Sequence, residues 1–456
     1  MKNQATESNS NFPQSLDKRS SFVWGVSTSA FQIEGASLEE GRGDSIWDVF
    51  CRQKDTIKDH SNGDVACDHY HRMQEDVNLI AALKIPSYRF SISWPRVQPL
   101  GEGTWNEKGF EFYSRLINSL IEKGISPHVT LYHWDLPQSL QDKGGWENRE
   151  TVNHFVNYAS EVARRFSHKV ASITTHNEPW VVAILGHESG MFAPGVKSTK
   201  TAMQVAHHLL LSHGLALKTL RQNDVKIPLG IVLNQSPIYP ATDSEADRKK
   251  TQLDDGLLIR WYMDPLIKGS YPQDILTYLG ENAPDVLPGD MQAIQQPLDF
   301  LGINYYTRGI ACATPPTESA NTGKEITAMG WEVYPQGLTD LLVRLDKDYQ
   351  LPPIYIMENG AAYDDQPSGD RIHDKERTQY IKRHIAAMQE AISLGVNVRG
   401  YFVWSLMDNF EWAEGYTKRF GIIFVDYKTQ RRLPKDSALW YRDFITSNIS
   451  KAQFIR

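Results

Sequence analysis

Apolar positions along the chain recur with two different spacings. Eight short segments are apolar and prone to form strands, and they cover residues 22–28, 87–93, 126–132, 172–178, 229–234, 300–306, 354–359 and 399–405. Between several of them the apolar residues follow helical spacing, most clearly over residues 73–83 and 151–167. The pattern predicts strands and helices that alternate along the chain.

An alternation of strands and helices implies a parallel sheet in an α/β protein. Eight strands, each followed by a helix, fit closure into a single (β/α)8 TIM barrel. The open, doubly wound sheet is the structural competitor. It lacks support because no GxGxxG follows the first strand and no GxxxxGK[ST] occurs in the sequence.

Three segments that follow predicted strands are too long to be simple connections. They span residues 35–65, 233–254 and 311–336 and carry clusters of Gly, Asp, Pro, Ser and Thr. In a TIM barrel they are βα loops on the catalytic face, so we expect them to wall a pocket there.

No internal repeat, low-complexity block or linker divides the sequence. We therefore expect residues 21–449 to form one domain. The polar residues 1–20 are expected to be a disordered tail, and residues 450–456 a short C-terminal tail.

The composition excludes several classes of protein. With 41% hydrophobic and 23% charged residues in 456, the chain has the profile of a globular protein. A net charge of −7 and the lack of a basic block argue against nucleic-acid binding. No stretch approaches the roughly 18 apolar residues of a membrane span, and the first twenty residues lack the apolar core of a secretory signal. Cys51, Cys67 and Cys312 form no CxxC pair, so free thiols in a reducing cytoplasm are predicted.

Two glutamates stand directly after apolar, β-prone runs. Glu178 follows residues 170–175 and precedes Pro179, and Glu358 follows residues 354–357 and precedes an Asn-Gly pair. A strand that ends in this way presents its carboxylate at the carboxyl end of a barrel, where the chemistry of TIM barrels takes place. Two carboxylates that face one pocket are the minimum needed to cleave a glycosidic bond.

Motifs along the chain then point to one family. In order, they are FVWG at 22–25, QIEG at 32–35, YRFSISW at 88–94, HWDLP at 133–137, NEP at 177–179, NYY at 304–306, ENG at 358–360 and WSLMDNFEW at 404–412. The chain resembles glycoside hydrolase family 1, the β-glucosidase-like retaining enzymes. The motifs run in family order over essentially all of the chain after residue 20.

The resemblance implies that Glu178 is the general acid/base and Glu358 the nucleophile. A retaining mechanism needs two such carboxyl groups about 5–5.5 Å apart. Arg89 would favour the ionised form of Glu358, and Tyr306 would donate a hydrogen bond to it. Glu178, close to a negative neighbour and partly desolvated, should have a raised pKa and stay protonated.

Further residues match the family positions that surround the substrate. The residues implied to hydrogen-bond the non-reducing sugar are Gln32, His133, Asn177, Glu411 and Trp412, with Trp404 as the platform beneath the ring. Among these, Asn177 would hold the 2-hydroxyl, a contact that strengthens in the transition state. Trp180, Trp331 and Phe420 resemble positions that line the leaving-group side.

The implied activity is that of a cytoplasmic, retaining exo-β-glycosidase. It would remove terminal β-D-glucosyl residues from small β-glycosides or oligosaccharides, with β-D-galactosyl and β-D-fucosyl residues as further candidates. No cofactor or metal is expected. His207, His208 and His213 on a predicted helix, and His69 and His71, lack HExxH spacing and are interpreted as packing residues. The oligomeric state stays open.

Two alternatives are a 6-phospho-β-glycosidase and a non-catalytic sugar-binding relative. Glu411 argues against the first, because a carboxylate facing the 4- and 6-hydroxyls would repel a phosphate. The presence of both glutamates argues against the second. Transglycosylation stays open, because Trp180 and Trp331 could hold a sugar acceptor.

The chain departs from the family pattern beside each glutamate. His176 replaces a common Phe, and Met357 replaces a common Thr. Strand alternation predicts that both side chains point away from the neighbouring glutamate.

Overall fold

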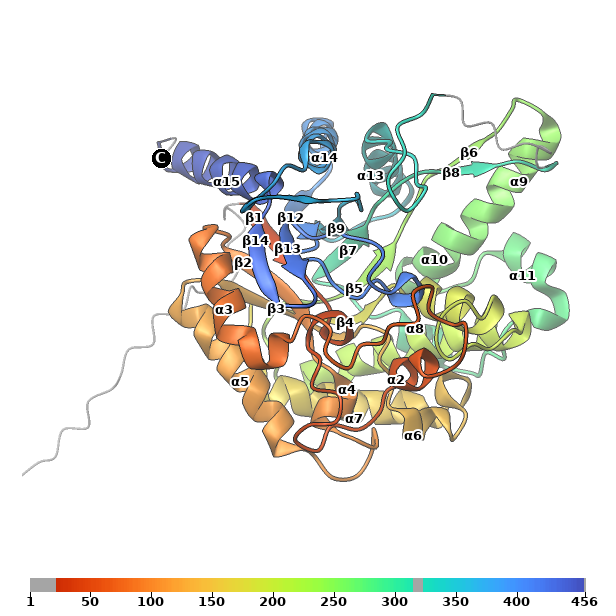
Figure 1. The fold of residues 1–456 in the computed structure, drawn as a ribbon. Helices are drawn as coiled ribbons and strands as arrows, with labels where there is room; N and C mark the ends of the chain where they lie inside the picture. The colour runs from red at the N-terminus through yellow and green to blue at the C-terminus, as the bar shows by residue number, and fades with distance from the viewer. Residues whose placement is uncertain (1–21, 315–322, 455–456) are drawn as a thin grey trace, which may run out of the picture.

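The computed structural model describes residues 22–314 and 323–454, and its centre is a closed barrel of eight parallel strands (Figure 1). The order around the barrel is β1-β12-β9-β7-β5-β4-β3-β2. These strands are β1 Val23–Ser27, β2 Ser87–Ser91, β3 Ser126–Tyr132, β4 Ser172–Asn177, β5 Leu229–Asn234, β7 Phe300–Asn304, β9 Ile354–Asn359 and β12 Val398–Trp404. The predicted TIM barrel is confirmed, and each predicted strand overlaps one of these eight.

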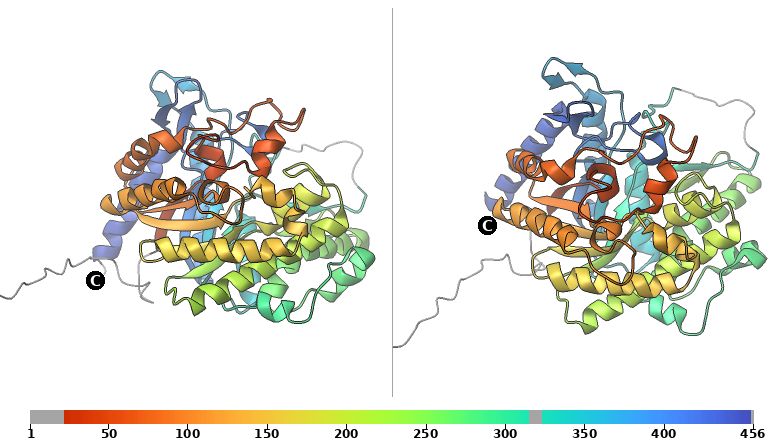
Figure 2. Two further views of the ribbon diagram at one scale, coloured as in Figure 1. Left: turned by 90° about the horizontal axis from the view of Figure 1, so that it is seen from below. Right: turned by 60° about the horizontal axis from the view of Figure 1, so that its bottom comes forward.

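Helices form a layer around the barrel, as two further views show (Figure 2). The longer ones are α3 His69–Ala82, α5 Glu107–Glu122, α7 Glu150–Phe166, α8 Thr199–Gln222, α9 Glu245–Asp255, α13 Gln336–Asp348, α14 Lys375–Ser393 and α15 Asp436–Phe454. The shorter ones are α1 Ala30–Ile33, α2 Ile46–Cys51, α4 Trp94–Val97, α6 Gln138–Gln141, α10 Trp261–Ile267, α11 Gln273–Leu279 and α12 Asp290–Ile294. Single turns and π-helical segments are η1 Gly145–Glu147, η2 Val181–Glu188, η3 Gly256–Arg260, η4 Gly280–Asn282 and η5 Trp412–Glu414.

The outward side chains of the strands and the apolar stripes of the helices form the main core. Val152, Phe155 and Val162 illustrate this on α7, where residues at helical spacing are buried against the barrel wall. The predicted tail at residues 1–20 lies outside the described residues. The last helix, α15, continues to Phe454 and so extends into the range assigned to a C-terminal tail. Within the described residues, no helix is both long enough and apolar enough to cross a membrane.

The long βα loops carry small elements of their own. Residues 35–65 contain α2, and residues 233–254 contain β6 (Ile238–Pro240) and most of α9. In the segment 311–336, residues 315–322 lie outside the described part. The other short strands are β8 Gly309–Ala311, which pairs with β6, the pair β10 Pro367–Ser368 and β11 Arg371–Ile372, and the hairpin of β13 Ile423–Asp426 and β14 Arg431–Pro434.

The barrel interior has a small apolar core of its own. It consists of the side chains of Val232, Phe300, Tyr355, Met357 and Phe402, separate from the main core outside the strands. Room for it comes from inward glycines, and a Cβ at Gly302 would come within 2.5 Å of Val232 and 2.9 Å of Met357. Because this core fills the barrel below the catalytic end, it forms the floor of any site above it.

An irregularity in β4 controls which way the residues before Glu178 point. Thr174 pairs with Gly230 and Asn177 with Val232, so β4 holds one residue more than β5 over this stretch. Thr175 and His176 both face α8, where they contact His213 and Ser212 at 2.7 and 2.8 Å. His176 therefore points away from Glu178, as predicted, but the extra residue is the cause, because regular alternation places residues two apart on the same face.

A similar irregularity in β9 corrects the prediction for Met357. Ile303 pairs with Ile356 but Asn304 pairs with Glu358, so Met357 is the extra residue. Met357 lies in the barrel interior, and the next residue, Glu358, also faces inward to contact Arg89 across the barrel. Simple alternation failed here because a bulge inserts one residue and so places two neighbours on the same side.

Met357→Ala is expected to destabilise the protein by roughly 2–5 kcal/mol, because the side chain is 1% exposed and its removal leaves a cavity in the barrel. The shift of the urea unfolding midpoint measures this loss. The matched control is Met191→Ala at a residue that is 60% exposed, which should change stability by at most about 0.5 kcal/mol. Similar shifts for both variants would contradict the enclosure of Met357.

Candidate active site

Glu358 lies at the end of β9 and is held by two donors. Arg89 Nη1 donates to Oε1 at 2.6 Å, and the Tyr306 hydroxyl donates to Oε2 at 2.6 Å. The same guanidinium donates from Nη2 to Asn177 Oδ1 at 2.6 Å and from Nε to Thr130 Oγ1 at 3.0 Å. These bonds fix Arg89, so a rigid cation stands beside the carboxylate.

Glu178 directly follows β4 and has a φ of 50°, a left-handed conformation that a glutamate rarely adopts. Its backbone N–H still donates to Val232 O at 2.9 Å, so the residue stays attached to the sheet as the chain turns into Pro179. On the side chain, Oε1 accepts a hydrogen bond from Asn304 Nδ2 at 2.7 Å. The turn thus presents the carboxyl at the end of the barrel.

Asn304 joins the two glutamates. It ends β7 and pairs with Glu358 in the sheet. Its Nδ2 donates to Asn177 Oδ1 at 3.1 Å as well as to Glu178. Asn177 in turn accepts from Arg89, which binds Glu358. Residues from β2, β4, β7 and β9 thus form one hydrogen-bonded network, and both glutamates belong to one site.

Burial and charge separate the protonation states of the two glutamates. Burial, and then the nearby charge of Glu358, raise the pKa of Glu178 to about 8. Burial also raises the pKa of Glu358, but Arg89, Tyr306 and Asn304 act against this rise. Glu178 is therefore mostly protonated at neutral pH, as an acid must be. Glu358 instead has two strong donors, Arg89 and Tyr306, which favour the ionised form that a nucleophile requires.

His133 and Asn177 form the edge of the site toward β3. Asn177 Nδ2 donates to His133 Nε2 at 3.2 Å, with the amide orientation set by the Arg89 bond to Oδ1. Burial and the nearby Arg89 charge hold the pKa of His133 well below its usual range, so the ring is neutral. Because Nε2 accepts, Nδ1 carries the proton, and within the described residues that buried atom has no protein partner.

Gln32 is oriented by the chain around it. Its Oε1 accepts from Ser29 Oγ at 2.6 Å, and its Nε2 donates to Asn409 Oδ1 at 3.0 Å and to Phe410 O at 2.8 Å. Nε2 also lies 3.5 Å from Glu411 Oε2. Burial, and then the charges of Glu358 and Glu414, raise the pKa of Glu411 to about 8. Glu411 is therefore mostly protonated at neutral pH in this structure.

Aromatic rings line two sides of the site. His133 stacks with Trp404 at a centroid distance of 5.7 Å and with Trp412 at 6.0 Å. On the other side Trp404 packs with Phe420, and half-buried Tyr306 and Trp331 lie against them. Trp180 packs instead on the main core beside Glu178. Of the three residues predicted on the leaving-group side, Trp331 and Phe420 thus lie together beside Tyr306, whereas Trp180 is not part of that cluster.

Sequence reasoning left one member of the network without a role. Asn304 matched the family motif, but only the pairing of β7 with β9 shows that it joins Glu178 and Glu358. Its position at a strand end was the available signal. Thr130, which orients Arg89, lies within β3 and offered no such signal.

The histidines considered as metal ligands have other partners. His207 contacts Tyr271 OH and Asp290 Oδ2, both at 3.0 Å, and His208 Nδ1 lies 2.8 Å from Trp146 O. Over residues 22–314 and 323–454, no three His, Cys, Asp or Glu side chains gather in a way that could hold a metal ion.

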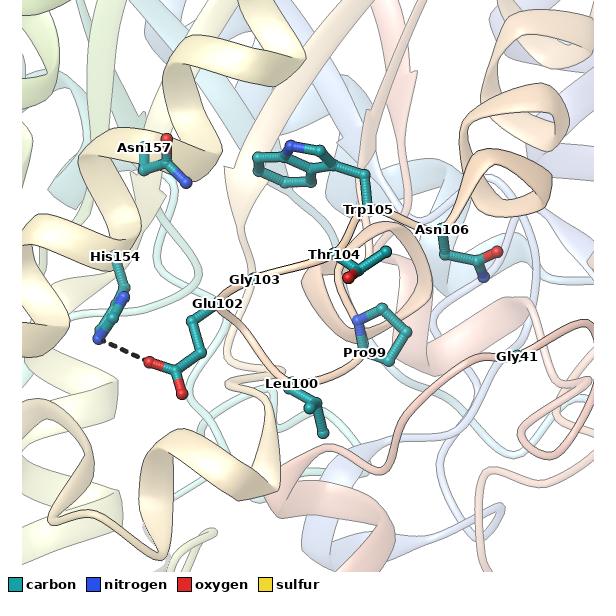
Figure 3. Close-up of a pocket in the computed structure, with 10 residues that line it drawn as sticks. All are labelled: Gly41, Pro99, Leu100, Glu102, Gly103, Thr104, Trp105, Asn106, His154 and Asn157. Carbon is teal, nitrogen blue, oxygen red and sulfur yellow. Dashed lines mark ion pairs between the residues drawn. The ribbon is translucent and has the colours of Figure 1, made fainter.

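A cavity of about 760 Å³ lies apart from this network, between α7 and the segment that follows α4 (Figure 3). Its lining includes Trp105 and Asn157, and across it Glu102 pairs with His154 at 3.4 Å. It shares no lining residue with the glutamate site.

Comparisons with known proteins agree on one family. The model of "Glycosyl hydrolase family 1" matches residues 14–450. Beta-glucosidase A of Acetivibrio thermocellus is 47% identical over 437 residues, which are 94% of this chain and 98% of that protein. Beta-glucosidase A of Thermotoga maritima is 45% identical over 94% of this chain and 97% of its own length.

Solved structures show the same likeness. The family 1 β-glucosidase from Thermotoga maritima in complex with isofagomine lactam has a TM-score of 0.91 and 44% identity, covering 96% of this chain and 99% of that one. The psychrophilic β-glucosidase BglU from Micrococcus antarcticus has a TM-score of 0.92 at 44% identity, covering 94% and 97%. On its sequence, its barrel and these relatives, the chain belongs to glycosyl hydrolase family 1.

Proposed function

We propose that the protein is a retaining β-glucosidase that removes terminal, non-reducing β-D-glucosyl residues by double displacement. The observation that carries this proposal is the pair of buried glutamates joined through Asn304 but given different partners, an amide on Glu178 and a guanidinium with a phenol hydroxyl on Glu358. Such a pair supplies both the acid and the nucleophile that a retaining glycosidase needs. The relatives named above are β-glucosidases, which supports glucose as the sugar.

In the first step, a Glu358 oxygen forms a bond to the anomeric carbon. The bond from that carbon to the leaving oxygen breaks as Glu178 transfers its proton to this oxygen. Arg89 and Tyr306 hold Glu358 in place and keep it ionised beforehand. The product of this step is a glucosyl ester of Glu358, and the aglycone leaves as an alcohol.

In the second step, water attacks the anomeric carbon and the ester bond to Glu358 breaks. Glu178 is now a carboxylate and takes a proton from the water. Its pKa falls because Glu358 loses its charge in the ester, and that charge had helped to raise the pKa. Glucose leaves with its β configuration, and both glutamates return to their starting states.

The remaining residues would hold the sugar and the aglycone. Asn177 bonds the 2-hydroxyl, and the proton on His133 Nδ1 is available to a further hydroxyl. We assign Gln32, Glu411 and Trp412 to the hydroxyls at the far side of the ring, and Trp404 to its apolar face. Trp331 and Phe420 would contact the leaving group beside Tyr306, with Trp180 on the Glu178 side. Galactosides and fucosides are further candidate substrates, and the cytoplasm is the proposed location.

The protein is expected to hydrolyse 4-nitrophenyl β-D-glucopyranoside at least tenfold more efficiently than its 6-phosphate. A phosphate near Glu411 would lose its water in a buried pocket, and a protonated Glu411 could offer it one hydrogen bond but no positive charge, which costs several kcal/mol. Comparison of kcat/KM for the two substrates tests the substrate class. Preference for the phosphorylated compound would contradict it, and binding without turnover would indicate a non-catalytic relative.

Glu358→Gly is expected to lower kcat by at least about 10⁴-fold, because no covalent intermediate can form. Azide or formate should restore turnover by occupying the space of the lost carboxylate, and azide should yield an α-glucosyl product, identified by NMR. Glu281→Gly, at an exposed position outside the site, is the control and should retain activity. A β-glucosyl azide from the Glu358 variant would contradict the nucleophile assignment.

Glu178→Ala is expected to reduce kcat/KM by roughly 10²–10⁴-fold for poor leaving groups and far less for 2,4-dinitrophenolate, which leaves without a proton. In the native enzyme, activity should fall as pH rises through about 8, where Glu178 loses its proton, and this alkaline limb should vanish in the variant. The acid limb, set by protonation of Glu358, should persist. Equal losses for all leaving groups would contradict the acid role.

A further inference from the structure

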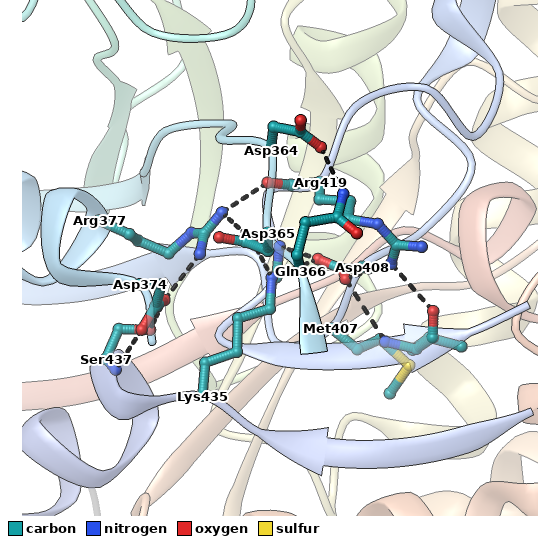
Figure 4. A network of polar contacts seen from close by, with 12 residues as sticks. Asp364, Asp365, Gln366, Asp374, Arg377, Met407, Asp408, Arg419, Lys435 and Ser437 are labelled. Atoms are coloured by element: carbon teal, nitrogen blue, oxygen red, sulfur yellow. Dashed lines mark hydrogen bonds and ion pairs between the residues drawn. The ribbon is translucent and has the colours of Figure 1, made fainter. Parts of the chain in front are cut away.

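A cluster of buried charges joins the segments that follow β9 and β12, and the mechanism above makes no use of it (Figure 4). Its members are the carboxylates of Asp365, Asp374 and Asp408 and the cations of Arg377, Arg419 and Lys435. The side chains of Asp408 and Lys435 are fully buried at 0% exposure. Buried ions of this kind need paired charges and hydrogen bonds, so their arrangement is tightly constrained.

Asp408 holds both ends of the segment 408–421. Its Oδ1 accepts from the backbone N–H of Gly421 at 3.0 Å and from Lys435 Nζ at 2.7 Å. Its Oδ2 accepts from Arg419 Nη1 at 2.6 Å. One carboxylate thus closes a loop of the chain that begins at Asp408 itself and returns at Arg419 and Gly421.

Lys435 and Arg377 tie this loop to the neighbouring βα loop. Lys435 Nζ donates to Asp365 Oδ2 at 2.6 Å, and Asp365 belongs to the segment that follows Glu358 and β9. Arg377, on α14, donates to the backbone carbonyls of Ala361 at 3.2 Å and Arg419 at 2.7 Å. The cluster therefore joins the segment after the nucleophile to the segment that carries Glu411.

Residues assigned to the sugar and to the leaving group lie on the loop 408–421. Glu411 is three residues after Asp408, and Phe420 follows Arg419. Asn409 and Phe410, directly after Asp408, accept the two bonds that orient Gln32. Asp408 therefore anchors the start of the stretch that carries Glu411 and that contacts Gln32.

The charges of the cluster balance, with three carboxylates and three cations. Loss of one partner from such a group leaves an unpaired buried charge and is strongly destabilising, whereas removal of a matched pair can be nearly neutral. This difference makes it possible to separate a role in stability from a role in geometry.

We propose that Lys435 and Asp408 are positioning residues for sugar recognition. They hold Glu411 against the hydroxyls at carbons 4 and 6 of the glucosyl ring, the contact expected for it above, without touching the sugar. The proposal rests on the proposed glucosidase function. It assigns to this cluster the choice between hexopyranosides that carry the 6-hydroxyl and those that lack it.

The test compares 4-nitrophenyl β-D-glucopyranoside with its 6-deoxy analogue in Lys435→Met and in the isosteric Asp408→Asn. For the glucoside we expect kcat/KM to fall roughly tenfold, mainly through a higher KM, which is the scale of a lost hydrogen bond in a buried site. For the 6-deoxy analogue the loss should be at least threefold smaller. The alkaline limb assigned to Glu178 should stay in place, because the cluster does not contact Glu178.

A charge-balanced variant and a remote control separate positioning from folding. Lys435→Met combined with Asp365→Asn removes one positive and one negative charge, so it should regain thermal stability but keep the altered preference. Arg344→Met breaks the ion pair of Arg344 with Asp255, between α13 and α9, and should lower stability without changing the preference.

The positioning role and the proposed function would be overturned by different results. Equal losses for both substrates in every cluster variant, or a normal preference in the charge-balanced variant, would overturn the positioning role. Failure of the native enzyme to hydrolyse the glucoside would instead overturn the proposed function. Asp408→Asn keeps the size of the side chain and one acceptor oxygen, so it provides the comparison even where Lys435→Met does not fold.

Discussion

Both glutamates of the site are buried away from water. The free energy of keeping a charge in such a place determines which partners each carboxyl group needs. A buried carboxylate without partners neutralises itself by taking up a proton. For Glu358 a fixed guanidinium and a phenol hydroxyl bind the two oxygens and act against the rise in pKa that burial causes. Among the described residues, the side chain of Glu178 has a hydrogen bond from the Asn304 amide alone, and its raised pKa keeps it protonated at neutral pH. One desolvated pocket thus produces an acid and a nucleophile from the same residue type.

Two of the barrel strands depart from regular strand geometry, and these irregularities set the directions of the side chains next to Glu178 and of Glu358 itself. In β4 the extra residue turns Thr175 and His176 outward together and returns Asn177 to the interior. In β9 the extra residue places Met357 in the interior core and Glu358 directly above it. A bulge changes the direction of a side chain while the strand keeps its hydrogen bonds on either side of the bulge. Bulges therefore suit strand ends that hold functional groups.

The sheet alone does not complete the site. Its strands provide Arg89, Asn177, Asn304 and Glu358, whose positions follow from barrel closure. Of the residues assigned to the far side of the sugar, Glu411 and Trp412 come from the segment after β12, outside the strands of the barrel. The buried cluster around Asp408 and Lys435 supplies the missing constraint, because ion pairs enclosed in protein tolerate little displacement. Rigid strands thus hold the reacting groups, and a tethered loop holds groups that recognise the substrate.

The sequence by itself determined the eight strands, their closure into a barrel and the placement of Glu178 and Glu358 at strand ends. Local periodicity and the residues that stop a strand carry that information, and ordered motifs identified the family. The inward direction of Met357, the link through Asn304 and the separation of Trp180 from Trp331 and Phe420 were decided only in the tertiary structure. They depend on register between strands and on contacts between residues far apart in the chain. Neither is encoded in the spacing of apolar residues within one segment, because a shift of a single residue in pairing reverses the face of every side chain that follows.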